Sequence, residues 1–214
     1  MKNQDIQTEL INAVNNGDDI VFLSYSMLDD TEDRIKLVLQ IILKNYQKDE
    51  WFTPLYSCIK ELLSNAIKAN AKRILIDEGV IKDPDNIIEV VNKLRTILNE
   101  ESLLEYGIKV KEKRLSTRIF LMVQDDTLII KVVNNLRLSS RELKRINDRI
   151  EKSYHYDSIA EFYLDNPDPV AEGMGLGLSM VVVLLKNIDI DPHNFTVTTD
   201  GREKTYAKIE IPLN

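Results

Sequence analysis

The chain has 214 residues, of which 43% are hydrophobic and 29% are charged, and its formal net charge is -7 at pH 7. This residue usage is that of an ordinary globular protein and excludes a disordered or fibrous chain, while the length fits one domain, with or without an insertion. The negative charge argues against a protein that coats a nucleic-acid backbone, because such binding needs clustered Lys and Arg.

The residue types also restrict the expected cellular compartment and the kinds of site that the chain can form. The single cysteine, Cys58, cannot form an internal disulfide, and the two histidines, His155 and His193, show no zinc-ligand spacing. The polar N-terminus lacks the apolar segment of a signal peptide, and the most apolar run, residues 176–185, is too short to cross a bilayer. We therefore expect a cytoplasmic protein with no membrane span and no nucleic-acid partner.

The first part of the chain predicts a strand and two helices. Ile20 to Tyr25 is a β-branched and aromatic run, and about Asp33 to Tyr46 repeats apolar residues at helical spacing. Thr53 followed by Pro54 predicts the start of the second helix, because threonine can cap free amides and proline is tolerated in the first turn. We expect this helix to end near Lys72.

An insertion and a hairpin are predicted next. Residues 77–112 contain turn formers and two charged helical pieces, at about 87–99 and 102–106. Residues 118–133 then hold two apolar runs around the turn formers Gln124 to Thr127, a pattern typical of two antiparallel strands joined by a tight turn.

The last part of the chain predicts a helix and two strands. Residues 138–169 are charged and rich in loop formers, with one helical stretch near 141–153. The sequence GMGLGL at residues 173–178 opens an apolar helix to about Asn187. Residues 194–199 and 205–212 then resemble two strands around Asp200 and Gly201.

One polar stripe marks the helix that follows Pro54. At 100° per residue, Glu61, Asn65, Lys68 and Lys72 fall close together. Apolar residues cover the opposite side: Leu55, Ile59, Leu62, Leu63 and Ala66. Taken alone, such a stripe is most often only a solvated face.

The glycine cluster is the second candidate. Gly173, Gly175 and Gly177 lie within five residues, directly before a helix. Bare amides and the partial positive charge of a helix N-terminus favour a phosphate. The alternative is a loop that needs glycine only for its backbone conformation.

Together and in this order, the two segments resemble the histidine-kinase-like ATPase superfamily, which contains gyrase, heat-shock chaperone, histidine kinases and mismatch-repair proteins. ELLSNAIKAN at residues 61–70 is similar to the N box, and EGMGLGLSMV at residues 172–181 is similar to the second glycine box. The hairpin ending in VVNN stands where the first glycine box belongs, and KTYAKIEIPL resembles the closing strand. The resemblance spans about residues 20–212.

The resemblance implies an α/β two-layer sandwich, in which three helices cover one face of a mixed, mainly antiparallel sheet. It implies a single ATP-binding domain over residues 1–214, with a helical insertion at about 77–112. ATP would lie between a helix and a mobile lid at about residues 138–172.

The resemblance also assigns roles. Asn65 would hold Mg²⁺ through its side-chain oxygen, Glu61 would polarise water or the acceptor, and Lys68 would reach the phosphates as a point charge. Other nucleotide contacts would come from the glycine turn and the closing strand, at Gly173, Gly175, Leu176, Gly177, Leu178 and Thr205.

The chain departs from the family at the first glycine box. Relatives read Asp, any residue, Gly, any residue, Gly, whereas residues 134–138 read NNLRL. Asn134 replaces the carboxylate that accepts a hydrogen bond from the adenine amino group. Its amide can accept too, or can turn to donate to guanine, which predicts a weaker preference for ATP over GTP, sharpened by Asn134→Asp. The missing glycines restrict the backbone beside the adenine pocket.

Three functions fit these observations. The first is a protein kinase of the anti-sigma-factor type, which transfers a phosphoryl group to a serine of a regulatory partner. The second is a stand-alone histidine-kinase catalytic domain whose phosphoacceptor protein is elsewhere, since neither His155 nor His193 has a phosphoacceptor setting. The third is a catalytically inactive nucleotide-sensing or scaffold module. A homodimer fits each of them, and Cys58 is expected to be a packed side chain.

Overall fold

The computed structural model describes residues 2–25, 31–83, 86–97, 100–166 and 176–214. Its strands are β1 (Ile20–Ser24), β2 (Thr117–Gln124), β3 (Thr127–Asn134), β4 (Phe195–Thr199) and β5 (Thr205–Pro212). They form one sheet in the order β1-β2-β3-β5-β4, and each of these neighbouring pairs is antiparallel. The predicted α/β fold class is confirmed, although the described strands include no parallel pair.

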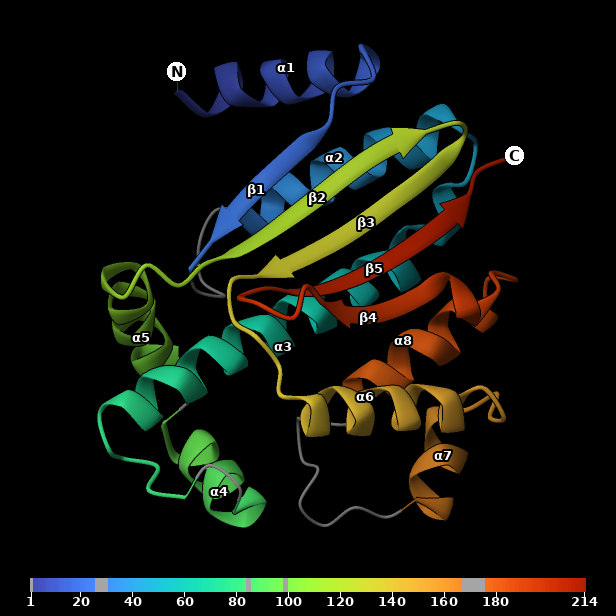
Figure 1. Cartoon of the computed structure of the whole chain (residues 1–214). Coiled ribbons are helices and arrows are strands. Elements are labelled where there is room, and N and C mark those ends of the chain that lie inside the picture. The colour runs from blue at the N-terminus through green and yellow to red at the C-terminus, as the bar shows by residue number, and fades with distance from the viewer. Residues whose placement is uncertain (1, 26–30, 84–85, 98–99, 167–175) are drawn as a thin grey trace.

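Helices α2 (Thr31–Asn45), α3 (Phe52–Asp77) and α8 (Leu176–Lys186) lie on one face of this sheet (Figure 1). The other described helices are α1 (Lys2–Asn15), α4 (Ile87–Ile97), α5 (Glu100–Glu112), α6 (Ser140–Ser153) and α7 (Ile159–Asp165), with short 3-10 turns η1 (Asp49–Trp51) and η2 (Pro192–Asn194). Buried residues of α2, α3 and α8 share one hydrophobic core with the strands. Within the described part of the chain, no helix is long and apolar enough to cross a membrane.

Alternation along β3 decides where its last residue points. Leu128, Ile130, Val132 and Asn134 are the buried positions of this strand. Since side chains alternate between the faces of a sheet, Asn134 shares the core face with three apolar residues. In register with it lies Thr205 of β5. Asn134 and Thr205 thus form a polar pair at the end of the apolar core. The opposite face of the sheet is open to solvent on β1, where Val21 is 49% exposed and Leu23 is 46% exposed.

The predicted hairpin of β2 and β3 is confirmed. Asp125 and Asp126 form its two-residue connection, with φ angles of 48° and 55°. The type I′ turn, whose twist matches that of the flanking strands, requires a positive φ at both central residues. Aspartate tolerates a positive φ better than most side chains do.

Helix α3 differs from its prediction at both ends. It begins at Phe52, and its N-cap residue is Trp51, which makes no side-chain capping bond. Thr53 is therefore not the cap, while Pro54 still falls in the first turn, where it disrupts no helical bond. The helix runs on to Asp77 because Ile74 and Leu75 pack in a second core with α4 and α5 of the insertion.

Two helices had no counterpart in the sequence prediction. Helix α1 is mostly polar, and Leu10, Ala13 and Val14 pack against the main core. Helix α7 buries Phe162, whose ring meets Tyr156 edge-on with centroids 5.2 Å apart. Each helix offers few apolar residues, so its local pattern is weak and tertiary packing decides it.

Candidate functional site

A cavity lies between α3 and the β3 and β5 strands. Its volume is about 100 Å³. Most of its lining is apolar, and its polar members are an amide on α3, an amide on β3 and a hydroxyl on β5. The lining residues are Leu62, Asn65, Ala66, Ala69, Val132, Asn134, Leu136, Leu138, Ile146, Leu178, Val197, Thr205 and Ala207.

The cavity gathers four of the residues singled out from the sequence. Asn65, Asn134, Leu178 and Thr205 all line it, although 140 residues of sequence separate the first from the last. Among the other described candidates, Glu61 and Gly177 contact each other beside Asn65, and Lys68 lies half-buried on α3. Four separate segments of the proposed motifs, on α3, β3, α8 and β5, therefore meet at one place.

Asn134 has one satisfied and one unsatisfied end. Its Nδ2 donates to the backbone oxygen of Ala66 at 3.1 Å. Its Oδ1 is buried and finds no hydrogen-bond partner among the described residues. A buried acceptor of this kind costs about 1–3 kcal/mol when it stays unpaired. Because it faces a cavity, Oδ1 can accept a hydrogen bond from a water or from a ligand that donates.

The segment after Asn134 is held by hydrogen bonds rather than shaped by glycines. Thr205 donates its hydroxyl to the backbone oxygen of Leu136 at 2.7 Å. The Asn135 side chain accepts from the Ser116 backbone at 2.6 Å and donates to the Arg114 backbone oxygen at 2.7 Å. The side chain of Leu136 lines the cavity, in the segment where the family has glycines.

Glu61 and Asn65 contact each other on α3. Asn65 Nδ2 donates to Glu61 Oε1 at 3.1 Å, across one helical turn. This bond leaves the amide oxygen of Asn65, a ligand of the kind that Mg²⁺ prefers, as its other polar atom.

Gly177 lies against Glu61. It is the second residue of α8, and no left-handed φ is found there. The glycine is explained by space: a Cβ at this position would lie 1.5 Å from Glu61 Oε1. The alternative that this glycine serves a loop conformation is therefore wrong for Gly177.

The polar stripe on α3 is half-buried along its length rather than fully exposed to solvent. At its far end, Lys72 Nζ lies 3.0 Å from Glu142 Oε1 of α6. Glu142 also forms a capping box with Ser139. Burial raises the pKa of the Glu142 carboxyl, but hydrogen bonds from Ser139 and Lys72, with the lysine charge, outweigh this and leave the pKa below its usual value.

The proposed lid region contains two helices. Helix α6 buries Ile150 and Ser153, and the chain after it is held by Lys186, whose Nζ donates to the backbone oxygens of Tyr154 at 3.1 Å and Tyr156 at 2.8 Å. Residues 167–172 of that region, Gly173, Gly175 and the Leu176 side chain lie outside the described part of the structure. The lid and these contacts remain predictions.

The weaker sequence candidates have ordinary surroundings. Cys58 is fully buried, and burial raises the pKa of its thiol to about 12, so it is a packed side chain as expected. His155 is exposed, and His193 pairs with Asp191 at 2.7 Å beside the Tyr154 ring. Among the described residues, no group of three or more His, Cys, Asp or Glu side chains could hold a metal ion.

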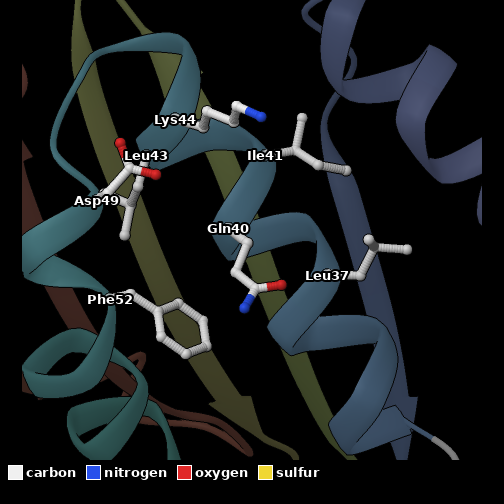
Figure 2. Close-up of a pocket in the computed structure, with 7 residues that line it drawn as sticks. All are labelled: Leu37, Gln40, Ile41, Leu43, Lys44, Asp49 and Phe52. Carbon is white, nitrogen blue, oxygen red and sulfur yellow. The ribbon is translucent and has the colours of Figure 1, made fainter.

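A larger groove, of about 360 Å³, lies elsewhere, between α2 and the start of α3 (Figure 2). It is lined by Leu37, Gln40, Ile41, Leu43, Lys44, Asp49 and Phe52. Its polar side chains, Gln40, Lys44 and Asp49, are exposed to solvent. The smaller cavity is the stronger candidate, because it alone of the two contains a buried polar atom that lacks a partner within the described structure.

Several lining residues were not predicted from the sequence. Ala66 and Ala69 leave space for the cavity on α3, and Ile146 of α6 lines it too. Two small residues three positions apart beside Asn65 were a signal of close approach on that helix face. The role of the Ala66 backbone oxygen has no sequence signal, since every residue carries that atom.

Comparison with known proteins gives one relative of note. The chain is 29% identical over 187 residues to a Treponema pallidum (strain Nichols) protein described as uncharacterized, and the match covers 84% of this chain and 34% of the relative. The chain thus spans about a third of that protein's length. No protein-family model and no solved structure matches the chain.

Proposed function

We propose that this chain is an ATP- and Mg²⁺-binding domain of the histidine-kinase-like ATPase superfamily, and that it acts in the cytoplasm as a regulatory protein kinase on a partner protein. The observation that carries the proposal is the convergence of Asn65, Asn134 and Thr205 on one cavity. These residues come from the N-box helix, the strand at the first glycine box and the closing strand, in the order that the resemblance requires.

The cavity suits the base of the nucleotide. Its apolar walls fit a flat ring, and the unpaired Oδ1 of Asn134 fits an amino group that donates. Its volume of about 100 Å³ is below the roughly 300–1,000 Å³ of most ligand pockets. The cavity would therefore hold the base, while the ribose and phosphates lie outside it, toward Glu61 and α8.

The residues beside the cavity suit the phosphates. Lys68 supplies a positive charge on α3, and α8 presents its N-terminus next to Glu61. Asn65 would hold Mg²⁺, with phosphate oxygens and waters as the remaining ligands. The metal would neutralise phosphate charge during transfer. We expect Mg²⁺ to enter with the nucleotide, because phosphate oxygens would supply part of its ligand set.

Glu61 is the candidate catalytic group, since it lies beside Asn65 and could polarise water or the acceptor hydroxyl. A serine of a regulatory partner protein is the acceptor that we favour. His193 already pairs with Asp191 on an exposed turn, and His155 lies on an exposed connection, so we expect neither to be phosphorylated.

A second function is favoured by residues 134–138. Hydrogen bonds from Thr205 and Asn135 hold this segment, and Leu136 and Leu138 occupy cavity wall where the family carries glycines. A pocket so constrained fits a catalytically inactive module that senses nucleotide or serves as a scaffold.

Calorimetric titration of the chain with ATP and Mg²⁺ tests the proposal. We expect saturable binding that is abolished in Ala69→Phe, where the ring fills the cavity. Asn12→Phe on the exposed side of α1, outside the proposed lid, should bind like wild type. Absence of binding in folded wild-type protein would reject the kinase and the nucleotide sensor and would leave only a scaffold.

An assay for phosphate release, and for transfer of labelled phosphate to a co-purified partner, then distinguishes an active kinase or ATPase from an inactive module. Release or transfer supports the kinase or ATPase. Binding without either supports the inactive module.

A further inference from the structure

Gly177 occupies an unusual place for a glycine. It lies within helix α8, where glycine is the poorest helix former after proline. It has no left-handed φ that would explain its presence. The backbone conformation at this position therefore does not require glycine.

The side chain of Glu61 lies in the space beside this glycine. A Cβ built on Gly177 would lie 1.5 Å from Oε1, 2.0 Å from Cδ and 2.5 Å from Cγ of Glu61. These distances are far inside van der Waals contact, so the carboxyl end of Glu61 fills the space that any other residue would use. Asn65 holds the same Oε1 by its hydrogen bond at 3.1 Å.

The position of this carboxylate has an electrostatic reason. The first four N–H groups of a helix have no partner within the helix, and the N-terminus carries a partial positive charge. The Glu61 carboxylate packs on the second residue of α8, within reach of that partial charge. A phosphate group is attracted by the same end of a helix, so the two anions compete.

We propose that Gly177 is a positioning residue: its missing side chain seats the Glu61 carboxylate on the first turn of α8, where Glu61 stands in for a phosphate until nucleotide displaces it. The identity of the displacing ligand rests on the proposed function, whereas the seating of Glu61 does not. Displacement would also release Glu61 from Gly177, so that nucleotide binding itself moves the candidate catalytic carboxylate.

A double-mutant cycle tests the seating without any ligand. In the wild-type background, the methyl group of Gly177→Ala pushes the flexible carboxyl end of Glu61 off α8. The loss of this contact should offset the gain of alanine in the helix, so the melting temperature should stay unchanged or fall. In a Glu61→Ala background, the same change should raise it by about 1–4 °C, the gain of alanine over glycine in a helix. Gly107→Ala in α5 is the control, and its shift should be the same in both backgrounds. Equal shifts for Gly177→Ala in the two backgrounds would overturn the proposal.

Titration with ATP in the presence of a magnesium chelator tests the displacement. Glu61→Gln removes the competing charge and keeps the shape of the side chain, so it should bind ATP about three- to tenfold more tightly than wild type. Equal affinity overturns the competition. If the stability cycle shows coupling but no variant binds ATP, the seating of Glu61 stands and the proposed function fails. If wild type binds ATP but the cycle shows no coupling, the proposed function stands and this inference fails.

Discussion

Asn134 of β3 donates its side-chain nitrogen to the backbone oxygen of Ala66 on α3, at 3.1 Å. A backbone oxygen can only accept, so this bond determines which way the amide faces. If the amide were turned over, two acceptor oxygens would stand at that distance, beside a mostly apolar cavity. Oδ1 is therefore the atom of Asn134 that remains for a ligand.

This geometry changes the expectation for the base. Because Oδ1 is the only polar atom of Asn134 left for a ligand, this side chain can accept a hydrogen bond from the amino group of adenine. It would repel the carbonyl oxygen of guanine, which can only accept. We predict that ATP binds more tightly than GTP by about 1–3 kcal/mol, the usual cost of an unsatisfied buried group. The sequence alone predicted a weaker preference for ATP over GTP, on the assumption that the amide can turn freely. The bond to Ala66 removes that assumption. Paired titrations with ATP and GTP check this, and equal affinities would show that the amide does turn.

Replacement of Asn134 by aspartate should destabilise the fold rather than sharpen recognition. The carboxylate cannot donate to the Ala66 oxygen and brings a buried charge next to it. We predict a loss of about 1–3 kcal/mol in the free energy of unfolding at neutral pH. Denaturant unfolding measures the loss, with Asn12→Asp on the exposed side of α1 as control. An unchanged stability would show that the bond to Ala66 contributes nothing.

Replacement of Asn65 tests the metal role. Asn65→Ala should weaken ATP binding when Mg²⁺ is present and change it little when the metal is chelated, because the amide oxygen acts through the metal. Isothermal titration under both conditions gives the comparison. Ser64→Ala, the adjacent residue on α3, is the matched control. A loss of affinity that ignores Mg²⁺ would remove Asn65 from the metal site.

Stability should depend on pH through Glu142. In the folded state, burial raises the pKa of this carboxyl, but hydrogen bonds from Ser139 and Lys72 outweigh the effect of burial and hold the pKa below its usual value. A carboxyl of this kind stabilises the fold above its unfolded pKa, and the contribution is lost as the pH falls through the folded pKa. We predict that Glu142→Gln melts below wild type at about pH 7, and that the difference shrinks as the pH falls below about 4.5.

Calorimetry across this range measures the pH effect. Glu161→Gln, at an exposed position of α7, should show no such pH dependence. A wild-type advantage that persists in acid would show that Glu142 acts by packing instead of charge.

Lys186 should control the connection between α6 and α7. It holds the backbone oxygens of Tyr154 and Tyr156 and pairs with Asp157. We predict that Lys186→Met speeds amide hydrogen exchange in residues 154–166, because those groups lose their anchor. Lys152→Met, at an exposed position near the end of α6, is the control.

The same exchange measurement applies to the proposed lid. Ordering by phosphate contacts should slow exchange in residues 138–172 when ATP and Mg²⁺ are added. Helix α6 is already held by the Glu142 ion pair and by the buried side chains of Ile150 and Ser153. We therefore expect ATP to change the exchange rate least in this helix. Equal exchange with and without ligand would argue against a lid.

Local patterns were sufficient for the sheet and its hairpin. Two apolar runs predicted β2 and β3, and the turn formers Gln124 to Thr127 between them predicted the turn, because short strands and tight turns depend on residues close in sequence. Helix boundaries were harder. The cap expected at Thr53 and the end expected near Lys72 were wrong, since packing of Ile74 and Leu75 on the insertion lengthens α3.

For the candidate site, the sequence by itself determined which residue types were available: an amide and a carboxylate one turn apart on a helix, a glycine at the start of another helix, and an asparagine ending a strand. Tertiary structure decided what these residues do. The Ala66 backbone oxygen orients Asn134, and the Glu61 carboxyl explains Gly177. Neither effect has a sequence signature, because one depends on a backbone atom that every residue carries and the other on empty space between two helices far apart in the chain.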